Sequence, residues 1–153
     1  MKSNIIEFEK FKIKTTKDVF SPRDDVEIFP KAIEALIKRK SKILELGTGT
    51  GAISISIAKY FKDITILATD INSSALRIAK QNAIINKVDQ IIDFKKSNWF
   101  SDIKENKYDF IISNPPYLSK HNSIFYTELS DPENSLYAKN DGLKHNLIQL
   151  NYL

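Results

Sequence analysis

The fold of this 153-residue chain can be predicted outward from Lys42-Ile43-Leu44-Glu45-Leu46-Gly47-Thr48-Gly49-Thr50-Gly51. A short apolar run ends in a turn with glycine at alternate positions, and an apolar segment from about Ala52 to Phe61 follows. The run favours a buried strand, and the later segment favours a helix. Glycines allow positive φ and close backbone approach where a strand enters a helix. We therefore expect a strand, a tight turn and a helix here.

The same alternation continues along the chain and predicts a doubly wound α/β fold with a mostly parallel sheet. Pro30 suits the first turn of a helix. We expect strands or a hairpin within 5–20, a turn at 21–25, and a helix up to Lys40 with Ala32, Ile33, Leu36 and Ile37 on one face. After the glycine turn and its helix, we expect a strand over 64–69 ending in Asp70. A helix capped by Ser73 or Ser74 should then run through Asn86, with Leu76, Ala79, Ala83 and Ile84 on one face. Strands over 91–95 and 108–113 and a helix over 143–150 complete the prediction.

Two segments follow from this pattern: an N-terminal hairpin and linker at 1–29, and a domain over 30–153. The length suits one domain with a real core and is too short for two. Four parallel strands would leave the fourth strand at an open edge. We therefore expect that the last strands of the sheet are missing and that the chain is a fragment.

The composition excludes several classes of protein. With no cysteine and two histidines, the chain is not expected to hold a metal or a disulfide. No apolar stretch approaches the roughly 18 residues of a membrane span, and no signal core is present, so we expect a cytoplasmic protein. The net charge of +4 allows a nucleic-acid partner, but the lysines are spread along the sequence.

The glycine turn favours a particular cofactor. Its Gly-x-Gly-x-Gly spacing lacks the dinucleotide fingerprint, and no Lys-Ser/Thr pair follows it. Glu45 would repel a pyrophosphate and suits a cationic ligand. Asp70, at the end of the next strand, is placed to hold a ribose diol. These features predict S-adenosylmethionine (SAM), although a tight strand-to-helix connection alone would also explain the turn.

A second motif, Asn114-Pro115-Pro116-Tyr117, directly follows a strand-like run. An amide or aryl amine is a poor nucleophile because its lone pair is delocalised. The Asn114 side-chain oxygen and the Pro115 carbonyl can accept both N–H hydrogens of such a group, and Tyr117 offers a flat face for stacking. Proline stiffens the turn. The motif therefore predicts methyl transfer to a planar nitrogen; the alternative is a rigid surface turn.

With both motifs, the sequence resembles the class I, Rossmann-like SAM-dependent methyltransferases, and within them the HemK/PrmC-type enzymes. Further segments are similar to that family: 19–27 to its Pro-Arg-x-Asp-x-Glu segment, 46–52 to its cofactor loop, 97–100 to its Ser-Asp-Trp-Phe, and Asp131-Pro132 with 140–143 to the stretch after the catalytic motif. The chain departs from the family at Asp24, Val26 and Asn98, where Asn98 replaces an acid. By that resemblance, we expect the family's N-terminal helical domain to be missing.

The resemblance implies roles for residues of this sequence. Asn114, Pro115 and Tyr117 would be catalytic and, with Pro116 and Arg23, would contact the substrate. The cofactor would be bound by Glu45, Gly47, Thr48, Gly49, Gly51, Asp70, Asn98, Trp99 and Asn114.

The family methylates the glutamine side-chain amide in the Gly-Gly-Gln loop of peptide-chain release factors, and this is the predicted reaction and partner. Two alternatives stay open. One is methylation of the exocyclic amine of adenine in DNA or RNA, although no target-recognition segment is evident. The other is a truncated, non-catalytic fragment that binds SAM or a partner protein.

Overall fold

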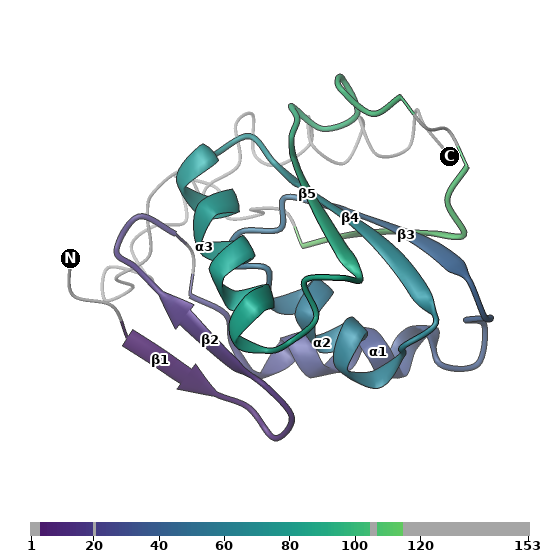
Figure 1. The fold of residues 1–153 in the computed structure, drawn as a ribbon, viewed down its shortest axis with the longest axis horizontal. Helices are drawn as coiled ribbons and strands as arrows, with labels where there is room; N and C mark the ends of the chain where they lie inside the picture. The colour runs from purple at the N-terminus through teal and green to yellow at the C-terminus, as the bar shows by residue number, and fades with distance from the viewer. Residues whose placement is uncertain (1–3, 20, 105–106, 115–153) are drawn as a thin grey trace, which may run out of the picture.

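The computed structural model of the chain describes residues 4–19, 21–104 and 107–114, and within these ranges it contains two sheets (Figure 1). One is an antiparallel hairpin and the other is a parallel sheet of four strands with helices packed on it. The elements are β1 (Asn4–Glu7), β2 (Lys12–Thr15), the 3-10 helix η1 (Asp24–Glu27), α1 (Ile28–Ile33), β3 (Ser41–Leu46), α2 (Ala52–Tyr60), β4 (Ile64–Asp70), α3 (Ser73–Ile85), β5 (Ile92–Lys96) and β6 (Phe110–Ser113).

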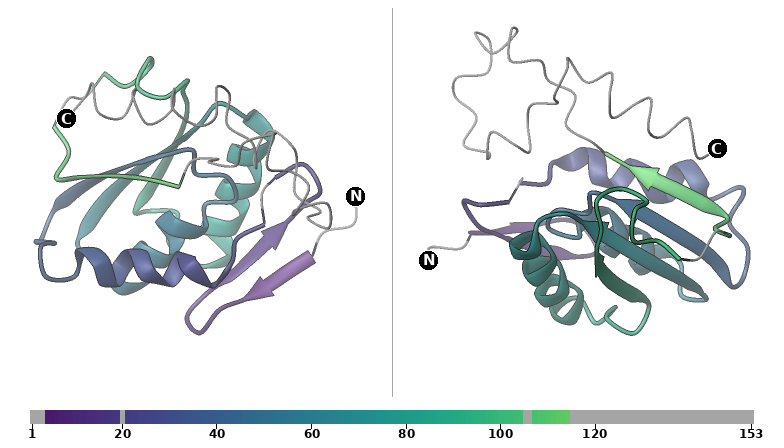
Figure 2. Two further views of the ribbon diagram at one scale, coloured as in Figure 1. Left: turned by 180° about the vertical axis from the view of Figure 1, so that it is seen from behind. Right: turned by 90° about the horizontal axis from the view of Figure 1, so that it is seen from above.

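The parallel sheet has the strand order β5-β4-β3-β6. From β3 the chain steps outward through α2 to β4 and through α3 to β5, and it then returns to the other side of β3 as β6. Two successive crossovers of the same hand place α2 and α3 on one face of the sheet. There α1, α2 and α3 pack against one another in sequence order (Figures 1 and 2). The predicted parallel α/β sheet is confirmed.

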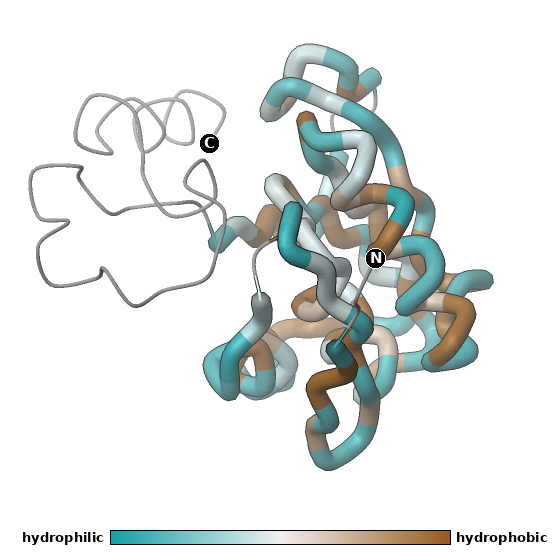
Figure 3. Tube along the Cα trace, turned by 90° about the vertical axis from the view of Figure 1, so that its left-hand side faces the viewer, coloured by the Kyte–Doolittle hydropathy of each residue, from teal (hydrophilic) through white to brown (hydrophobic). Residues whose placement is uncertain are grey.

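The hydrophobic core lies between this sheet and the three helices. The first seven residues of α2 are all buried, because the helix is enclosed by the sheet, α1 and α3. The strands β3 and β4 contribute Ile43 and Ile66, and the hairpin contributes Phe11 and Ile13. The colouring of Figure 3 alternates along the chain between brown and teal, as expected when most elements have one buried and one exposed face.

The hairpin is attached to the domain by two asparagines, Asn82 in α3 and Asn86 at its C-cap. The side-chain amide of Asn82 accepts from the Lys14 N–H (2.8 Å) and donates to the Lys14 carbonyl (2.9 Å). One turn later, Asn86 accepts from the Lys12 N–H (3.0 Å) and donates to the Lys12 carbonyl (2.7 Å). The two amides thus act as a neighbouring strand would, satisfying one edge of β2 from a helix. Figure 1 shows the hairpin alongside α3.

The first helix differs from the sequence prediction. It ends at Ile33 rather than at Lys40, and Leu36 is 68% exposed. The chain enters α1 through the 3-10 turn η1, so helical geometry begins earlier than Pro30 and the buried stripe is shifted. The stripe consists of Val26, Pro30, Ile33 and the partly buried Ile37.

The third helix also differs in detail. Its N-cap is Asn72, whose side-chain oxygen accepts from Ser74 N (2.9 Å) and Ala75 N (3.4 Å); the prediction of Ser73 or Ser74 was wrong. Ile84, predicted on the apolar face, is 63% exposed. The helix instead buries Asn82, which was not among the residues predicted on that face and whose amide bonds to the hairpin.

Other boundaries shift by one or two residues: β5 begins at Ile92 and β6 at Phe110. The expected helix over 143–150 and the matches at 131–132 and 140–143 lie outside the described residues. In the described ranges, no helix is long and apolar enough to cross a bilayer. Over the same ranges, no group of acidic, histidine or cysteine side chains could hold a metal ion.

Candidate active site

The two sequence motifs meet where the strand order of the parallel sheet reverses. β3 has β4 on one side and β6 on the other, and the chain reaches these neighbours by connections that run in opposite directions. In open α/β sheets the crevice outside the carboxyl ends of the strands at such a point is where ligands bind. The glycine turn follows β3 and Asn114 follows β6, so both lie at this crevice.

The register between β3 and β6 brings the motifs together. Leu46 is the partner of Ser113 in the parallel ladder. The Ser113 hydroxyl also donates to the Leu46 carbonyl (3.0 Å), a contact between residues 67 positions apart. Gly47 follows Leu46 at the end of β3, and Asn114 follows Ser113 at the end of β6. Asn114, the first residue of the tetrapeptide, therefore lies beside Gly47, the first glycine of the turn.

The glycines of the turn have different surroundings. Gly47 has φ +73°, is exposed, and a side chain there would meet nothing within 4 Å. Gly51 has φ +82° and forms the N-cap of α2, and a Cβ there would lie 3.0 Å from the Cβ of Ala79 on α3. Gly47 thus leaves open backbone for a ligand, whereas Gly51 allows α2 and α3 to pack closely.

Glu45 lies beneath the turn and is 1% exposed. Its carboxyl oxygen Oε2 accepts hydrogen bonds from the hydroxyls of Thr48 (2.7 Å) and Ser54. Burial raises the pKa of Glu45 from its ordinary value of 4.5 to about 7, because desolvation outweighs these two hydrogen bonds. The carboxyl group and the inward-facing Thr48 therefore fix the shape of the turn from inside.

Asp70, at the carboxyl end of β4, bonds to the same turn. Its Oδ2 accepts from Gly49 N (2.8 Å), and its Oδ1 accepts from Asn72 N (2.8 Å). Burial raises the pKa of Asp70, against the lowering effect of these backbone N–H groups. A carboxylate has about four acceptor positions, so Asp70 retains acceptor capacity for hydroxyl groups.

The segment after β5 forms a tight turn that presents an aromatic ring. Trp99 has φ +53°, a left-handed conformation that is uncommon for a bulky residue and is held by its surroundings. The Ser97 hydroxyl donates to the Trp99 carbonyl (2.7 Å) and accepts from Asp102 N (3.2 Å). Ser97 N also donates to the Asp70 carbonyl (3.1 Å), which joins this turn to the end of β4. Asn98 beside it is exposed.

One residue at the site has no counterpart in the sequence prediction. Besides its bonds to the hairpin, the Asn82 side chain donates to the Thr50 carbonyl in the glycine turn (2.9 Å), and it is fully buried. It thus ties the turn, α3 and the hairpin together. A buried asparagine within an otherwise apolar helix face was the available signal, but a sequence does not show which carbonyls it faces.

The structure brings most of the predicted residues to one edge of the sheet. The backbone of Gly47 and Gly49, the carboxylate of Asp70 and the exposed Asn98 meet there, with Asn114 beside them. Arg23 is exposed and forms the N-cap of η1, on the connection from the hairpin to α1. Pro115, Pro116 and Tyr117 lie outside the described residues.

Comparison with known proteins identifies the family. The methyltransferase small domain family matches residues 10–129 of this chain. The chain is 37% identical over 143 residues to a release factor glutamine methyltransferase of Fusobacterium nucleatum, covering 90% of this chain and 40% of that protein. It is 38% identical over 128 residues to a bifunctional methyltransferase of Rickettsia prowazekii, covering 80% of this chain and 25% of that protein. The chain thus spans less than half of each of these curated relatives.

Solved structures agree in fold. The catalytic domain of hMettl16 in complex with an RNA hairpin superposes with a TM-score of 0.70 at 18% identity, covering 92% of this chain and 57% of that one. P. horikoshii TYW2 in complex with MeSAdo gives a TM-score of 0.60 at 20% identity, covering 71% of this chain and 41% of that one.

The chain belongs to the methyltransferase small domain family and has the class I SAM-dependent methyltransferase fold. Its cofactor is therefore SAM, as predicted. The residues present fit that group: Gly47 leaves room for a ligand, Asp70 offers a carboxylate for hydroxyls, and Asn98 offers an exposed amide.

Proposed function

We propose that this chain transfers a methyl group from SAM to the side-chain amide nitrogen of a glutamine in a peptide-chain release factor, in the cytoplasm. The observation that carries the proposal is the β3–β6 register, because it puts Asn114 beside the open Gly47. A group that binds the acceptor nitrogen therefore adjoins the turn that faces the cofactor.

The relatives support the glutamine acceptor over other planar nitrogens. The Fusobacterium nucleatum protein is named a release factor glutamine methyltransferase. A protein of Buchnera aphidicola with the same name is 40% identical over 129 residues, covering 80% of this chain and 45% of that protein. The Asn-Pro-Pro-Tyr tetrapeptide of this chain suits an amide, whose two N–H hydrogens need two acceptors.

The chemistry follows from orientation rather than from a strong base. Bound SAM would supply an electrophilic methyl group: the S–CH3 bond breaks as the N–CH3 bond forms, S-adenosylhomocysteine leaves, and the nitrogen loses a proton to solvent after the transfer. The side-chain oxygen of Asn114 and the carbonyl of Pro115 accept the amide hydrogens, which fixes the nitrogen with its lone pair toward the cofactor turn. These acceptors bind more strongly as positive charge develops on the nitrogen, so they stabilise the transition state more than the ground state. Tyr117 stacks on the planar amide, and Pro116 and Arg23 complete the substrate contact.

The cofactor is held by the edge described above. Asp70 would accept from the ribose hydroxyls, Asn98 and Trp99 would hold the adenine, and the backbone of Gly47 and Gly49 would hold the amino-acid part. Glu45, Thr48 and Gly51 contribute from inside the turn by holding its conformation, since all three are buried.

A transfer assay tests the proposal. The purified chain is incubated with SAM carrying a tritiated methyl group and a full-length release factor. The matched substrate control is the same release factor with the glutamine of its Gly-Gly-Gln motif replaced by alanine. We expect label only in the unmodified factor, and Asn114→Ala should abolish it while leaving the affinity for S-adenosylhomocysteine unchanged. Asp70→Ala should weaken that affinity by about 10- to 100-fold, as expected for a lost charged hydrogen bond.

Other outcomes separate the alternatives. Label in an adenine-containing oligonucleotide but not in the release factor would assign the acceptor to nucleic acid. Binding of S-adenosylhomocysteine at micromolar strength with no transfer to either acceptor would show a cofactor-binding module rather than an enzyme.

A further inference from the structure

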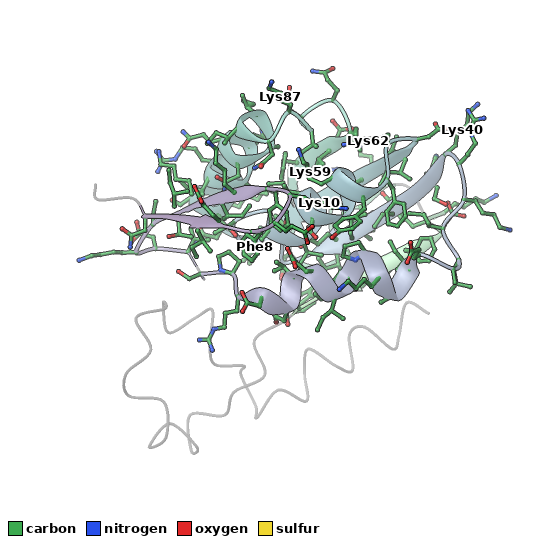
Figure 4. The ribbon with its side chains drawn as sticks, turned by 90° about the horizontal axis from the view of Figure 1, so that it is seen from below. Phe8, Lys10, Lys40, Lys59, Lys62 and Lys87 are labelled. Carbon is green, nitrogen blue, oxygen red and sulfur yellow. The ribbon has the colours of Figure 1, made fainter. Side chains whose placement is uncertain are left out.

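Five lysines lie at the end of the parallel sheet where its strands begin, opposite the candidate active site at the carboxyl ends of the strands. Each comes just before a strand or in a connection that leads to one, so the parallel topology collects them at the amino ends of β3, β4 and β5 and at the β1–β2 turn. We call this surface the lysine edge; Figure 4 labels its members, which are Lys10, Lys40, Lys59, Lys62 and Lys87.

Side-chain contacts connect three of these elements in space. The Lys10 ammonium lies 3.8 Å from the centre of the Tyr60 ring, at the end of the helix that also carries Lys59. The Lys59 ammonium in turn donates to the Asn86 carbonyl (3.4 Å), one residue before Lys87. The hairpin turn, the end of α2 and the end of α3 therefore place their cations on one surface (Figure 4).

The positive charge of this surface is incompletely balanced. Burial and then the neighbouring Lys59 lower the pKa of Lys62, so these two ammonium groups repel each other. The carboxylate next to Lys62, Asp63, is bound by Arg39 at 2.6 Å. The other carboxylates at this edge include Glu9 and Asp89. Within the described ranges, none of the five lysines of the lysine edge forms an ion pair with a carboxylate.

Helix capping explains only part of the arrangement. Lys59 and Lys62 each donate to a carbonyl at a helix C-terminus, Asn86 and Ala58 respectively, which suits the helix dipole. An ammonium group has three N–H donors, so two remain on each. Lys10, Lys40 and Lys87 make no such bond, and all three are exposed. Capping therefore does not account for the five charges gathered here.

We propose that the lysine edge binds the phosphate backbone of a nucleic acid without reading its sequence. Lysine is a point charge that suits phosphates. The arginine beside Lys40, Arg39, is paired with Asp63, so the unpaired cations of this surface are the lysines rather than a side chain suited to bidentate recognition of a base. The edge faces away from Gly47 and Asn114, so bound nucleic acid leaves the active site open. The surface would thus serve to localise the protein and would not present the methyl acceptor.

Fluorescence anisotropy tests this with a labelled 20-base-pair RNA duplex over a range of salt concentrations. We expect binding whose logarithm falls linearly with the logarithm of salt concentration, since counterions are released at each contacted phosphate. Neutralising Lys10, Lys59 and Lys62 together to glutamine should reduce the slope by about 0.9 per lysine and weaken binding by about a hundredfold or more at 0.1 M salt. A DNA duplex of the same sequence should behave alike.

Matched variants keep the test independent of folding and of catalysis. Replacing Lys59 and Lys62 by arginine retains charge and should retain binding, whereas glutamine at exposed Lys80 and Lys96, away from this edge, should change it little. Asn114→Ala should bind duplex as the parent does, whether or not the proposed methyl transfer is correct. Equal loss in the Lys80 and Lys96 variant, binding that ignores salt, or binding to poly-glutamate or anionic vesicles in preference to the duplex would overturn the proposal.

Discussion

The glycine turn is braced from two sides by buried polar groups of different kinds. From β3, the Glu45 carboxyl receives the hydroxyls of Thr48 and Ser54. From α3, the Asn82 amide donates to the Thr50 carbonyl and also pairs with the backbone of Lys14. Glu45 is 1% exposed and Asn82 fully buried, but one group can ionise and the other cannot.

The difference shows how the same burial has opposite consequences. A neutral amide with its donors and acceptor all bonded costs little to bury and is costly to remove. A carboxyl group in the same surroundings loses hydration when it ionises, and this raises its pKa to about 7. Asn82 is therefore a brace that does not depend on pH, whereas the brace from Glu45 changes near neutral pH.

The largest effect is expected from Asn82→Ala. The substitution leaves the Lys14 N–H, the Lys14 carbonyl and the Thr50 carbonyl without their partner, at about 1–3 kcal/mol for each buried group. We expect a loss of about 4 kcal/mol in the free energy of unfolding, measured by urea denaturation, and weaker binding of S-adenosylhomocysteine by the protein that remains folded.

Asn86→Ala is the matched control for that prediction. Asn86 makes the same kind of bonds to Lys12 of the hairpin, but none to the glycine turn. Its loss should destabilise the chain while leaving cofactor affinity near that of the parent. Equal loss of affinity in both variants would show that the hairpin, rather than the bond to Thr50, supports the turn.

The ionisable brace predicts a stability that depends on pH. Between the ordinary pKa of 4.5 and about 7, the folded protein retains a proton on Glu45 that the unfolded chain releases. Stability from this group is therefore full below pH 4.5 and is lost as the pH rises through 7. The loss is as much as about 3 kcal/mol at pH 8, at 1.4 kcal/mol per unit of pKa shift.

Glu45→Gln isolates this contribution. Its amide oxygen can still accept a hydroxyl, and it carries no titratable proton, so thermal unfolding should depend less steeply on pH between 5 and 8. The variant should gain most over the parent at pH 8. A residual slope of the same sign is expected from Asp70, whose pKa is also raised by burial. If the unfolding temperatures of the parent and of Glu45→Gln depended on pH in the same way, a group other than Glu45 would be titrating.

A smaller effect separates the two kinds of glycine in the turn. Gly51→Ala adds a methyl group 3.0 Å from Ala79 at a residue with φ +82°, so we expect a loss of about 2 kcal/mol in stability. Gly47→Ala meets no atom within 4 Å and should cost only the backbone term, about 1 kcal/mol. Calorimetry with S-adenosylhomocysteine should give the reverse order, with Gly47→Ala the weaker binder. If Gly51→Ala lost more than Gly47→Ala in both stability and cofactor affinity, the assignment of Gly47 to ligand binding and of Gly51 to helix packing would be wrong.

The sequence predicted the order of elements well because periodic burial is a local signal. The strands at β3 and β4 and the helices after them were expected almost to the residue, since each lies between clear turn residues. The end of α1 was missed because its stripe is fixed by packing of the preceding 3-10 turn. Ile84 was misplaced because the buried face of α3 runs through Ile78 and Asn82, and Asn82 is buried by its bonds to Lys14, 68 residues away, and Thr50, 32 residues away.

The sequence predicted which residues belong to the candidate site better than it predicted what each of them does there. Gly47, Asp70 and Asn114 were selected by motif, and the sheet brings them to one edge. Glu45 was expected to face a cationic ligand, yet in the structure it lies beneath the turn. A sequence gives the identity of an acid before a glycine turn but not its direction, and here the hydroxyls of Thr48 and Ser54 hold it inside.

The smallest effect concerns the start of α3, the helix that carries Asn82. The Asn72 side chain caps this helix by accepting from Ser74 N and Ala75 N, so Asn72→Ala should lower stability by about 1 kcal/mol. Ser73→Ala is the control: Ser73 is exposed and is the first residue of the helix rather than its cap, so the change should be near zero. Because Asn72 N still donates to Asp70 in the alanine variant, cofactor affinity should be retained. A larger loss from Ser73→Ala, measured by thermal unfolding, would mean that the helix begins where the sequence suggested and that α3 is offset relative to the glycine turn.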